Sequence, residues 1–363
     1  MALIYSPLFS LPSCEVVISM KRHIQSGFGL VELMIAMTLG LVLSAAVIQV
    51  TLASQRSHRV LEAAGFLQES GRIAVSFMIR DLRMAGYMGC PNLQRIPLNI
   101  IADKPPADFN FTAAGVLVGQ DNVSATNPYK AVENSDIVTI QRAVTPAVNL
   151  AGNVDLNNAN IQIESNPAGI GANDFVFVTD CINADLFKAT NVSNNGGNDN
   201  SNVTIAHASN SNTPNRLSKT YDVDAEVMGF QSRVYFVRGS NRTTSNGSAI
   251  NSLWVQARNL GSGATPVATE LVEGVENMQI RYGEDTDDDQ DIDVYRNAAD
   301  VSNWAAVLSV RIELLLHSLD DNIVGSSGEF VQNTLIYNGA AVASDQRLRR
   351  VYSTAVAIRN RLP

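Results

Sequence analysis

Two features near the amino terminus carry chemistry: a Gly-Phe bond and a carboxylate just beyond it. Gly27-Phe28 follows a short basic segment, and Glu32 is the one formally charged residue within residues 28–52. Hydrolysis between Gly27 and Phe28 would leave the apolar run in the mature chain, with Phe28 as its new amino terminus. An ionised carboxylate inside a bilayer costs several kcal/mol unless it is paired or close to the polar interface. Glu32 therefore needs a partner or a position near the membrane surface.

A second chemical feature is an acidic stretch late in the chain. Its aspartates fall at every second position: Asp285, Asp287, Asp289, Asp291 and Asp293. Oxygen ligands at relative positions 1, 3, 5, 7 and 9 resemble a calcium loop. Relative position 6 is Gln290 where such loops have glycine, and position 12 is Arg296 where they have a bidentate glutamate. The sequence leaves two interpretations: a calcium site, or a solvated acidic turn between strands.

The chain has three cysteines, Cys14, Cys90 and Cys181, with no C-x-x-C spacing. Two well-separated cysteines in a domain exported by a membrane anchor favour one disulfide, Cys90–Cys181, in an oxidising compartment. Such a bond would close a loop of about 90 residues and contribute roughly 4–5 kcal/mol in the chain-entropy model. The alternative is that both are buried free thiols.

Signatures of catalysis are missing from the sequence. The four histidines are scattered, and neither a G-x-S-x-G elbow nor a phosphate-binding loop occurs. The net charge of −9 also argues against nonspecific nucleic-acid binding, which needs a basic surface. We therefore expect a protein that is not an enzyme and does not bind nucleic acid.

The element that positions Gly27 and Glu32 is a long predicted helix. Residues 28–52 would span about 37 Å as helix, enough to cross a hydrocarbon core of about 30 Å. Beyond them, apolar residues recur at three- and four-residue steps, which predicts an amphipathic helix that packs on a globular head. We place this stripe on Leu61, Ala64, Gln68, Gly71, Val75, Met78, Leu82 and Ala85. Gly86, Gly89 and Pro91 are stop signals for the helix.

The remaining chain favours strands. Runs such as residues 136–140, 174–181, 233–238, 252–258, 307–316 and 350–359 are short, apolar and partly alternating. Residues 191–217 are dense in Asn, Ser and Gly and predict a long exposed loop. Helix first and antiparallel strands afterwards indicate an α+β fold, with the long amino-terminal helix packed on an antiparallel sheet and a large inserted loop region.

The predicted organisation has five parts. Residues 1–27 form a leader that is cleaved, with Met20, directly before Lys21 and Arg22, as the expected translation start. Residues 28–52 form a transmembrane helix, and residues 53–88 form the amphipathic helix. Residues 89–220 make a loop-rich αβ region with short strands, and residues 221–363 make an antiparallel β-sheet region.

Gly27, Phe28, Glu32, the basic leader and the apolar run together resemble the amino-terminal signal of type IV pilins and type II secretion pseudopilins. The resemblance implies a pilin-like fold, cleavage after Gly27 by a prepilin peptidase, and methylation of the new terminal Phe28. It also implies that residues 28–52 later pack in the core of a fibre. There Glu32 makes an assembly contact with the free amine of a neighbouring Phe28. The alternative is that Glu32 only reaches the lipid head groups.

Residues 81–90, 179–181, 275–285 and 350–361 are similar to the PilW-type minor pilins. That resemblance implies a subunit near the pilus tip that primes assembly and serves twitching motility and adhesion. The implied partners are other minor pilins, the major pilin, a tip-associated adhesin-like protein, prepilin peptidase and the inner-membrane assembly platform. The implied location is the inner membrane of a Gram-negative bacterium, crossed once with the head in the periplasm, and then the pilus at the cell surface.

Two other functions compete with this one. Residues 275–282 also resemble the J-type pseudopilins of type II secretion. A head that binds sugars or surfaces, as in a tip adhesin, is compatible with the Asn-rich loop and with Trp254 and Trp304, although core burial also explains both tryptophans.

Overall fold

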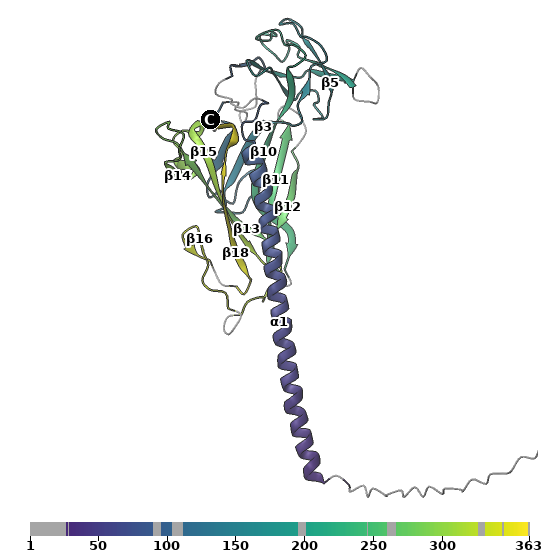
Figure 1. The fold of residues 1–363 in the computed structure, drawn as a ribbon, viewed down its shortest axis with the longest axis vertical. Helices are drawn as coiled ribbons and strands as arrows, with labels where there is room; N and C mark the ends of the chain where they lie inside the picture. The colour runs from purple at the N-terminus through teal and green to yellow at the C-terminus, as the bar shows by residue number, and fades with distance from the viewer. Residues whose placement is uncertain are drawn as a thin grey trace, which may run out of the picture. The chain divides into compact units, whose positions relative to one another are not determined.

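The computed structural model describes residues 27, 29–89, 96–103, 112–194, 201–244, 246–259, 266–325, 331–342 and 345–361. The chain divides into two compact units, Met1–Gln55 and Arg56–Pro363. The first unit contains the start of the long helix, and the second contains the rest of the helix together with the sheets (Figure 1).

The amino-terminal helix is α1, Leu30–Arg83, with 54 residues. It ends at Arg83, three residues before Gly86, the first of the predicted stop signals. Gly86 and Gly89 have φ of +71° and +84°, a left-handed backbone that glycine adopts without a Cβ clash. The Asn360 amide donates to the Ala85 carbonyl at 3.1 Å and so satisfies one carbonyl beyond the last turn.

The larger sheet has nine strands and is organised around β10, Glu226–Thr243. The first residues of β10 pair with β4 and β6, and its later residues pair with β3 and β11, all antiparallel. One 18-residue strand thus connects the two parts of this sheet. The other members are β1 Leu98–Ile100, β2 Leu117–Gln120, β3 Ile137–Ala143, β4 Val148–Asn149, β6 Phe175–Thr179, β7 Ala184–Lys188, β11 Ala249–Asn259 and β12 Ala268–Glu273.

The second sheet has four antiparallel strands in the order β14-β13-β15-β18. Their bounds are β13 Val275–Glu284, β14 Val294–Arg296, β15 Val307–His317 and β18 Arg349–Ala357. Smaller elements complete the head: strands β5 Asn160–Ser165, β8 Asn191–Asn194, β9 Ser201–Ala206, β16 Ile336–Tyr337 and β17 Ala340–Ala341, and 3-10 turns η2 Ala298–Asp300, η3 Trp304–Ala306 and η4 Arg359–Arg361.

One core joins α1 to both sheets. Its helical members are Leu67, Ala74, Met78 and Leu82, and Ala85 joins them from the turn just after the helix. They pack against β3, β10 and β11 of the larger sheet and against β13, β15 and β18 of the smaller one. The α+β prediction, with a long amino-terminal helix on antiparallel sheets, is confirmed.

The buried face of the helix differs from the predicted stripe at its start. Leu61 is 66% exposed and Gln68 is also exposed, whereas Ala63 and Leu67 are buried. From Gly71 onward the prediction is confirmed at four positions: Gly71, Met78, Leu82 and Ala85. The choice between neighbouring helical faces depends on where the sheets lie, which periodicity alone does not specify.

The Asn-rich stretch also differs from the expected exposed loop. Within its described residues, β8 and β9 form and pair with β5 in a three-stranded sheet. Val203 and Ile205 alternate with polar residues and are fully buried. Their alternation is a strand pattern, and the surrounding Asn and Ser residues obscured it.

Candidate functional site

The amino-terminal site lies at the first turn of α1. Gly27 is exposed, and Phe28 lies outside the described residues. The Gly29 carbonyl accepts from the amides of Glu32 and Leu33 at 3.0 and 3.1 Å, so it closes the first helical turn. Glu32 is exposed in that turn, where the positive end of the helix dipole favours a carboxylate.

The surface that follows Glu32 is apolar on every side of the helix. Each large apolar side chain from Leu30 to Leu52 is at least half exposed. The hydroxyls of Thr38, Ser44 and Thr51 donate to carbonyls of their own helix at 2.8–2.9 Å, so they need no water. Among the described residues, α1 is the helix long and apolar enough to cross a membrane. A surface of this size requires an apolar environment from lipid or from other subunits.

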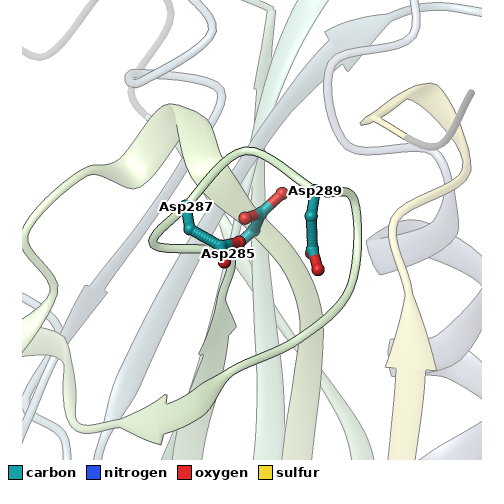
Figure 2. A group of neighbouring side chains, drawn as sticks. All are labelled: Asp285, Asp287 and Asp289. Atoms are coloured by element: carbon teal, nitrogen blue, oxygen red, sulfur yellow. The ribbon is translucent and has the colours of Figure 1, made fainter.

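The acidic loop joins β13 to β14, and it brings three of the five predicted calcium ligands together. One carboxylate oxygen from each of Asp285, Asp287 and Asp289 lies within 4.8 Å of the others (Figure 2). Asp285 is nearly buried, and it accepts from the amides of Asp288 and Gln290 at 2.7 and 2.9 Å. Asp285 therefore holds the loop in its turn, while Asp287 and Asp289 are exposed.

The other members of the acidic loop have different roles. The Asp293 carboxylate accepts from the amide and hydroxyl of Thr286, both at 2.7 Å, and these bonds lower the pKa of Asp293. Repulsion, first from Asp289 and then from Asp293, raises the pKa of Asp287. Calcium binding by the five aspartates, Asp291 included, stays a prediction.

The two departures from a calcium loop have structural counterparts. Gln290, at the usual glycine position, has φ of +74°, so the sharp turn forms without glycine. Arg296, at the usual glutamate position, pairs with the buried Glu284 at 2.9 Å. Glu284 also accepts from the amide of Asn303 at 2.6 Å. Position 12 thus supplies a cation that joins β14 to β13.

Of the predicted disulfide partners, Cys181 can be placed and Cys90 lies outside the described residues. Cys181 is disulfide-bonded and lies two residues beyond the end of β6, in a turn where its φ is +67°. Its amide donates to the Thr179 hydroxyl at 3.1 Å. The pairing Cys90–Cys181 stays a prediction.

Comparison with known proteins finds two family models that match this chain, one near each end. Residues 22–48 match the family model described as the prokaryotic N-terminal methylation motif. Residues 234–360, from β10 to η4, match the model of PilW, the type IV pilus-assembly protein W.

The chain is thus a PilW-like type IV pilus-assembly protein with an N-terminal methylation motif.

It is accordingly a type IV pilus-assembly minor pilin with a prepilin processing motif, a structural protein and not an enzyme. This similarity implies assembly with other pilus components and processing by prepilin peptidase. The apolar helix with its methylation motif is that of an inner-membrane prepilin that later enters a pilus. A solved structure, the type IV-like pilin TTHA1219 from Thermus thermophilus, is similar at 13% identity and a TM-score of 0.34, over 81% of this chain and 97% of that one. No curated protein sequence matches the chain.

Sequence reasoning missed the residue that links the helix to the PilW-like head by buried ion pairs. Asp81 is 3% exposed and lies 3.4 Å from Arg142 of β3 and 3.0 Å from Arg233 of β10. It also accepts from the Tyr235 hydroxyl. Its position beside Met78 and Leu82 on the helical stripe was the available signal, because a carboxylate on an apolar face needs a buried partner.

Both tryptophans of the head pack against neighbouring side chains. Trp304 is half-buried and meets Tyr282 edge-on, with ring centroids 4.7 Å apart. Trp254 is half-buried, donates to the Arg238 carbonyl at 3.1 Å, and is covered by the Arg238 guanidinium at 3.8 Å. These contacts favour the structural interpretation of Trp254 and Trp304 over ligand binding.

Proposed function

We propose that this PilW-like subunit primes type IV pilus assembly at or near the pilus tip, after cleavage at Gly27/Phe28 and methylation of Phe28. The observation that carries the proposal is the helix from Leu30 to Leu52, exposed and apolar on all sides with one carboxylate in its first turn. Such a surface fits lipid before assembly and a fibre core afterwards. The head region matched by the PilW model supports a specialised subunit.

The role proposed for Glu32 is an assembly contact with the amine of a neighbouring Phe28. Its carboxylate is exposed, so a second subunit can reach it. In an apolar fibre core an unpaired carboxylate is costly, and a neighbouring amine would offset that cost. Pairing of this kind fixes the stagger between subunits, because it forms at one axial offset only.

A deletion strain complemented with variants tests both the role in priming assembly and the assembly contact of Glu32. The Glu32→Gln variant should lower the number of surface pili at least about tenfold, because the pair loses its charge. The Glu62→Gln variant, which changes an exposed glutamate elsewhere on α1, should restore pili fully. Each variant must be present in the membrane at the wild-type level. Normal piliation with Glu32→Gln would contradict the assembly contact.

The same strains also test the cleavage after Gly27, the methylation of Phe28 and the assignment to the pilus. The Gly27→Leu variant should accumulate as an uncleaved precursor, and terminal sequencing of the wild-type protein should find methylated Phe28. A deletion strain with normal pili and defective type II secretion would instead assign the chain to the pseudopilins. A strain with normal pili and lost surface attachment would favour a tip adhesin.

We also propose the disulfide Cys90–Cys181. Cys181 is in a disulfide, and Cys14 leaves with the proposed leader, so Cys90 is the cysteine that remains. A Cβ on Gly89, the residue before Cys90, would lie 3.4 Å from the Thr179 methyl, two residues before Cys181. Mass spectrometry of the unreduced tryptic digest should find the Cys90 and Cys181 peptides linked. Free thiols at both positions would contradict the bond.

A further inference from the structure

The four-stranded sheet ends at β18, and one edge of this strand has no neighbouring strand among the described residues. The register between β18 and β15 is regular over all nine residues of β18. Successive residues of an antiparallel strand direct their backbone groups alternately to its two sides. The Ile358 amide donates to the Leu308 carbonyl of β15 at 2.8 Å, so even-numbered residues of β18 face β15 and odd-numbered residues face away from it.

The Gln332 side chain occupies the first position of this outer edge in the way that a neighbouring strand would. Its carbonyl accepts from the Arg349 amide at 2.9 Å, and its amide donates to the Arg349 carbonyl at 2.6 Å. Both bonds agree with the outward direction of the odd-numbered residues. Farther along, the backbone amides and carbonyls of Val351, Ser353 and Ala355 have no hydrogen-bond partner within the described part of the chain. The outer edge of β18 is therefore open after its first residue.

The nine-stranded sheet protects its edge strand β12, whereas the edge of β18 is unprotected. β12 has six residues, two of them glutamates, and its pairing with β11 contains a register shift. Charges, bulges and short length are the usual means by which proteins prevent an edge from pairing with another chain. From Val351 to Ala357, β18 has no charged residue, no proline and no register shift. Such an edge is a template for an added strand.

Side chains along the open edge leave room for a partner and keep β18 in place. Ser353, Ala355 and Ala357 are small and exposed. On the opposite face, Val356 is buried in the core and Tyr352 packs against it. A strand that binds here would find the pairing groups already ordered, which lowers the entropy cost of binding. Main-chain hydrogen bonds supply the affinity in this mode of recognition, and alternate side chains supply the specificity.

The direction of β18 argues against the same strand of a second copy as the partner. The Tyr352 ring lies against Gly71 of α1, and Ala85, just after α1, accepts from Asn360. The head-packed part of α1 and β18 therefore run in the same direction. Two β18 edges related by a two-fold axis would pair antiparallel, so their α1 helices would point in opposite directions. Subunits that leave one membrane with their heads on the same side have parallel helices, so the partner supplies a different strand.

We propose that the outer edge of β18, from Val351 to Ala357, pairs with an extended strand of a neighbouring pilus subunit, so that the four-stranded sheet continues across the subunit boundary. The inference rests on the proposed function, because that function supplies the neighbouring subunit. The backbones of Val351, Ser353 and Ala355 contribute three donors and three acceptors to the pairing. The small exposed side chains beside them lie next to those of the added strand.

A proline in the open edge tests the pairing. The Ser353→Pro variant removes one outward amide and leaves the ladder with β15 complete, because the Ser353 amide faces away from β15. A deletion strain complemented with it should carry at least about tenfold fewer surface pili. The matched control, Val223→Pro, places a proline at the second position of an exposed turn and should restore pili fully. Purified in detergent, both variants should melt within about 3 °C of the wild type. Full piliation with Ser353→Pro overturns the pairing, and the priming role stands if Glu32→Gln still lowers piliation.

Photocrosslinking identifies the partner, and it keeps the test decisive if Ser353→Pro does not fold. A benzophenone amino acid in place of Ala355 points to the solvent face of the sheet, so the edge itself stays open. Irradiated cells should yield a product with a strand of a different pilus subunit, which mass spectrometry of the linked peptides identifies. The same group in place of Arg281, exposed on β13 of the same sheet, should not yield this product. A product with a second copy of this chain only, a product outside a strand, or no protein product overturns the proposal.

Discussion

The two stretches of α1 differ in whether their apolar side chains are exposed or buried. From Leu30 to Leu52 the helix exposes every large apolar side chain, and from Ala63 to Leu82 it buries a stripe of them on its own sheets. Both belong to one continuous helix. The difference is what supplies the apolar surroundings: lipid or other subunits for the first stretch, and the chain itself for the second. Substitutions in the first should affect assembly, and substitutions in the second should affect folding.

The largest loss of stability should come from removing Asp81, whose ion pairs hold the second stretch to the head. Asp81→Ala leaves Arg142 and Arg233 without their shared buried counter-ion, so the free energy of unfolding should fall by about 3–5 kcal/mol. Glu69→Ala, an exposed carboxylate on the same helix, should change it by less than about 0.5 kcal/mol. Thermal and denaturant unfolding of the full chain in detergent, followed by circular dichroism, measures both. Equal stability of the two variants would remove the distinction drawn between buried and exposed carboxylates.

Replacing one glycine in each stretch by alanine gives a matched pair of variants. A Cβ on Gly71 would fall inside the contact distance of the Tyr352 ring, whereas a Cβ on Gly40 would meet nothing within 4 Å. Gly71→Ala should therefore destabilise the head by about 1–3 kcal/mol through overpacking. Gly40→Ala should leave head stability unchanged, because alanine is a better helix former and clashes with nothing in the chain. The same unfolding measurements apply, and a neutral Gly71→Ala would show that Tyr352 moves aside freely.

The smallest effect concerns pH and is confined to the head. Hydrogen bonds from Arg349 hold the pKa of Asp345 down to about 2, below the value of about 3.9 in unfolded chains. A lowered pKa stabilises the fold above about pH 4, and this contribution disappears as the pH falls from about 4 to 2. The Asp345 side chain is 42% exposed, so the contribution should stay below about 1 kcal/mol.

The Asp345→Asn variant isolates this contribution. It should be slightly less stable than the wild type at pH 7 and equally stable near pH 2. Melting temperatures measured at several pH values between 7 and 2 report the difference. A gap between the two proteins that stays constant over this range would mean that Asp345 does not titrate as its contacts indicate.

Much of the fold could be predicted because its signals are local. Helix termination at Gly86 and Gly89 and the apolar runs that became β3, β10 and β15 each depend on a few neighbouring residues. The strands around Val203 and Ile205 could not be recognised, since Asn and Ser flank them and mark loops in most contexts. The start of the helical stripe was placed on the wrong face for a similar reason: several faces were apolar enough.

The sequence alone determined the amino-terminal site and the long helix. Gly27, Phe28, Glu32 and an uninterrupted apolar run are contiguous, so their chemistry needs no tertiary contact. Only the tertiary structure decided that Asp81 meets Arg142, 61 residues away, and Tyr235, 154 residues away. It also decided which backbone groups of β18 face away from β15, because the register between strands belongs to the sheet as a whole.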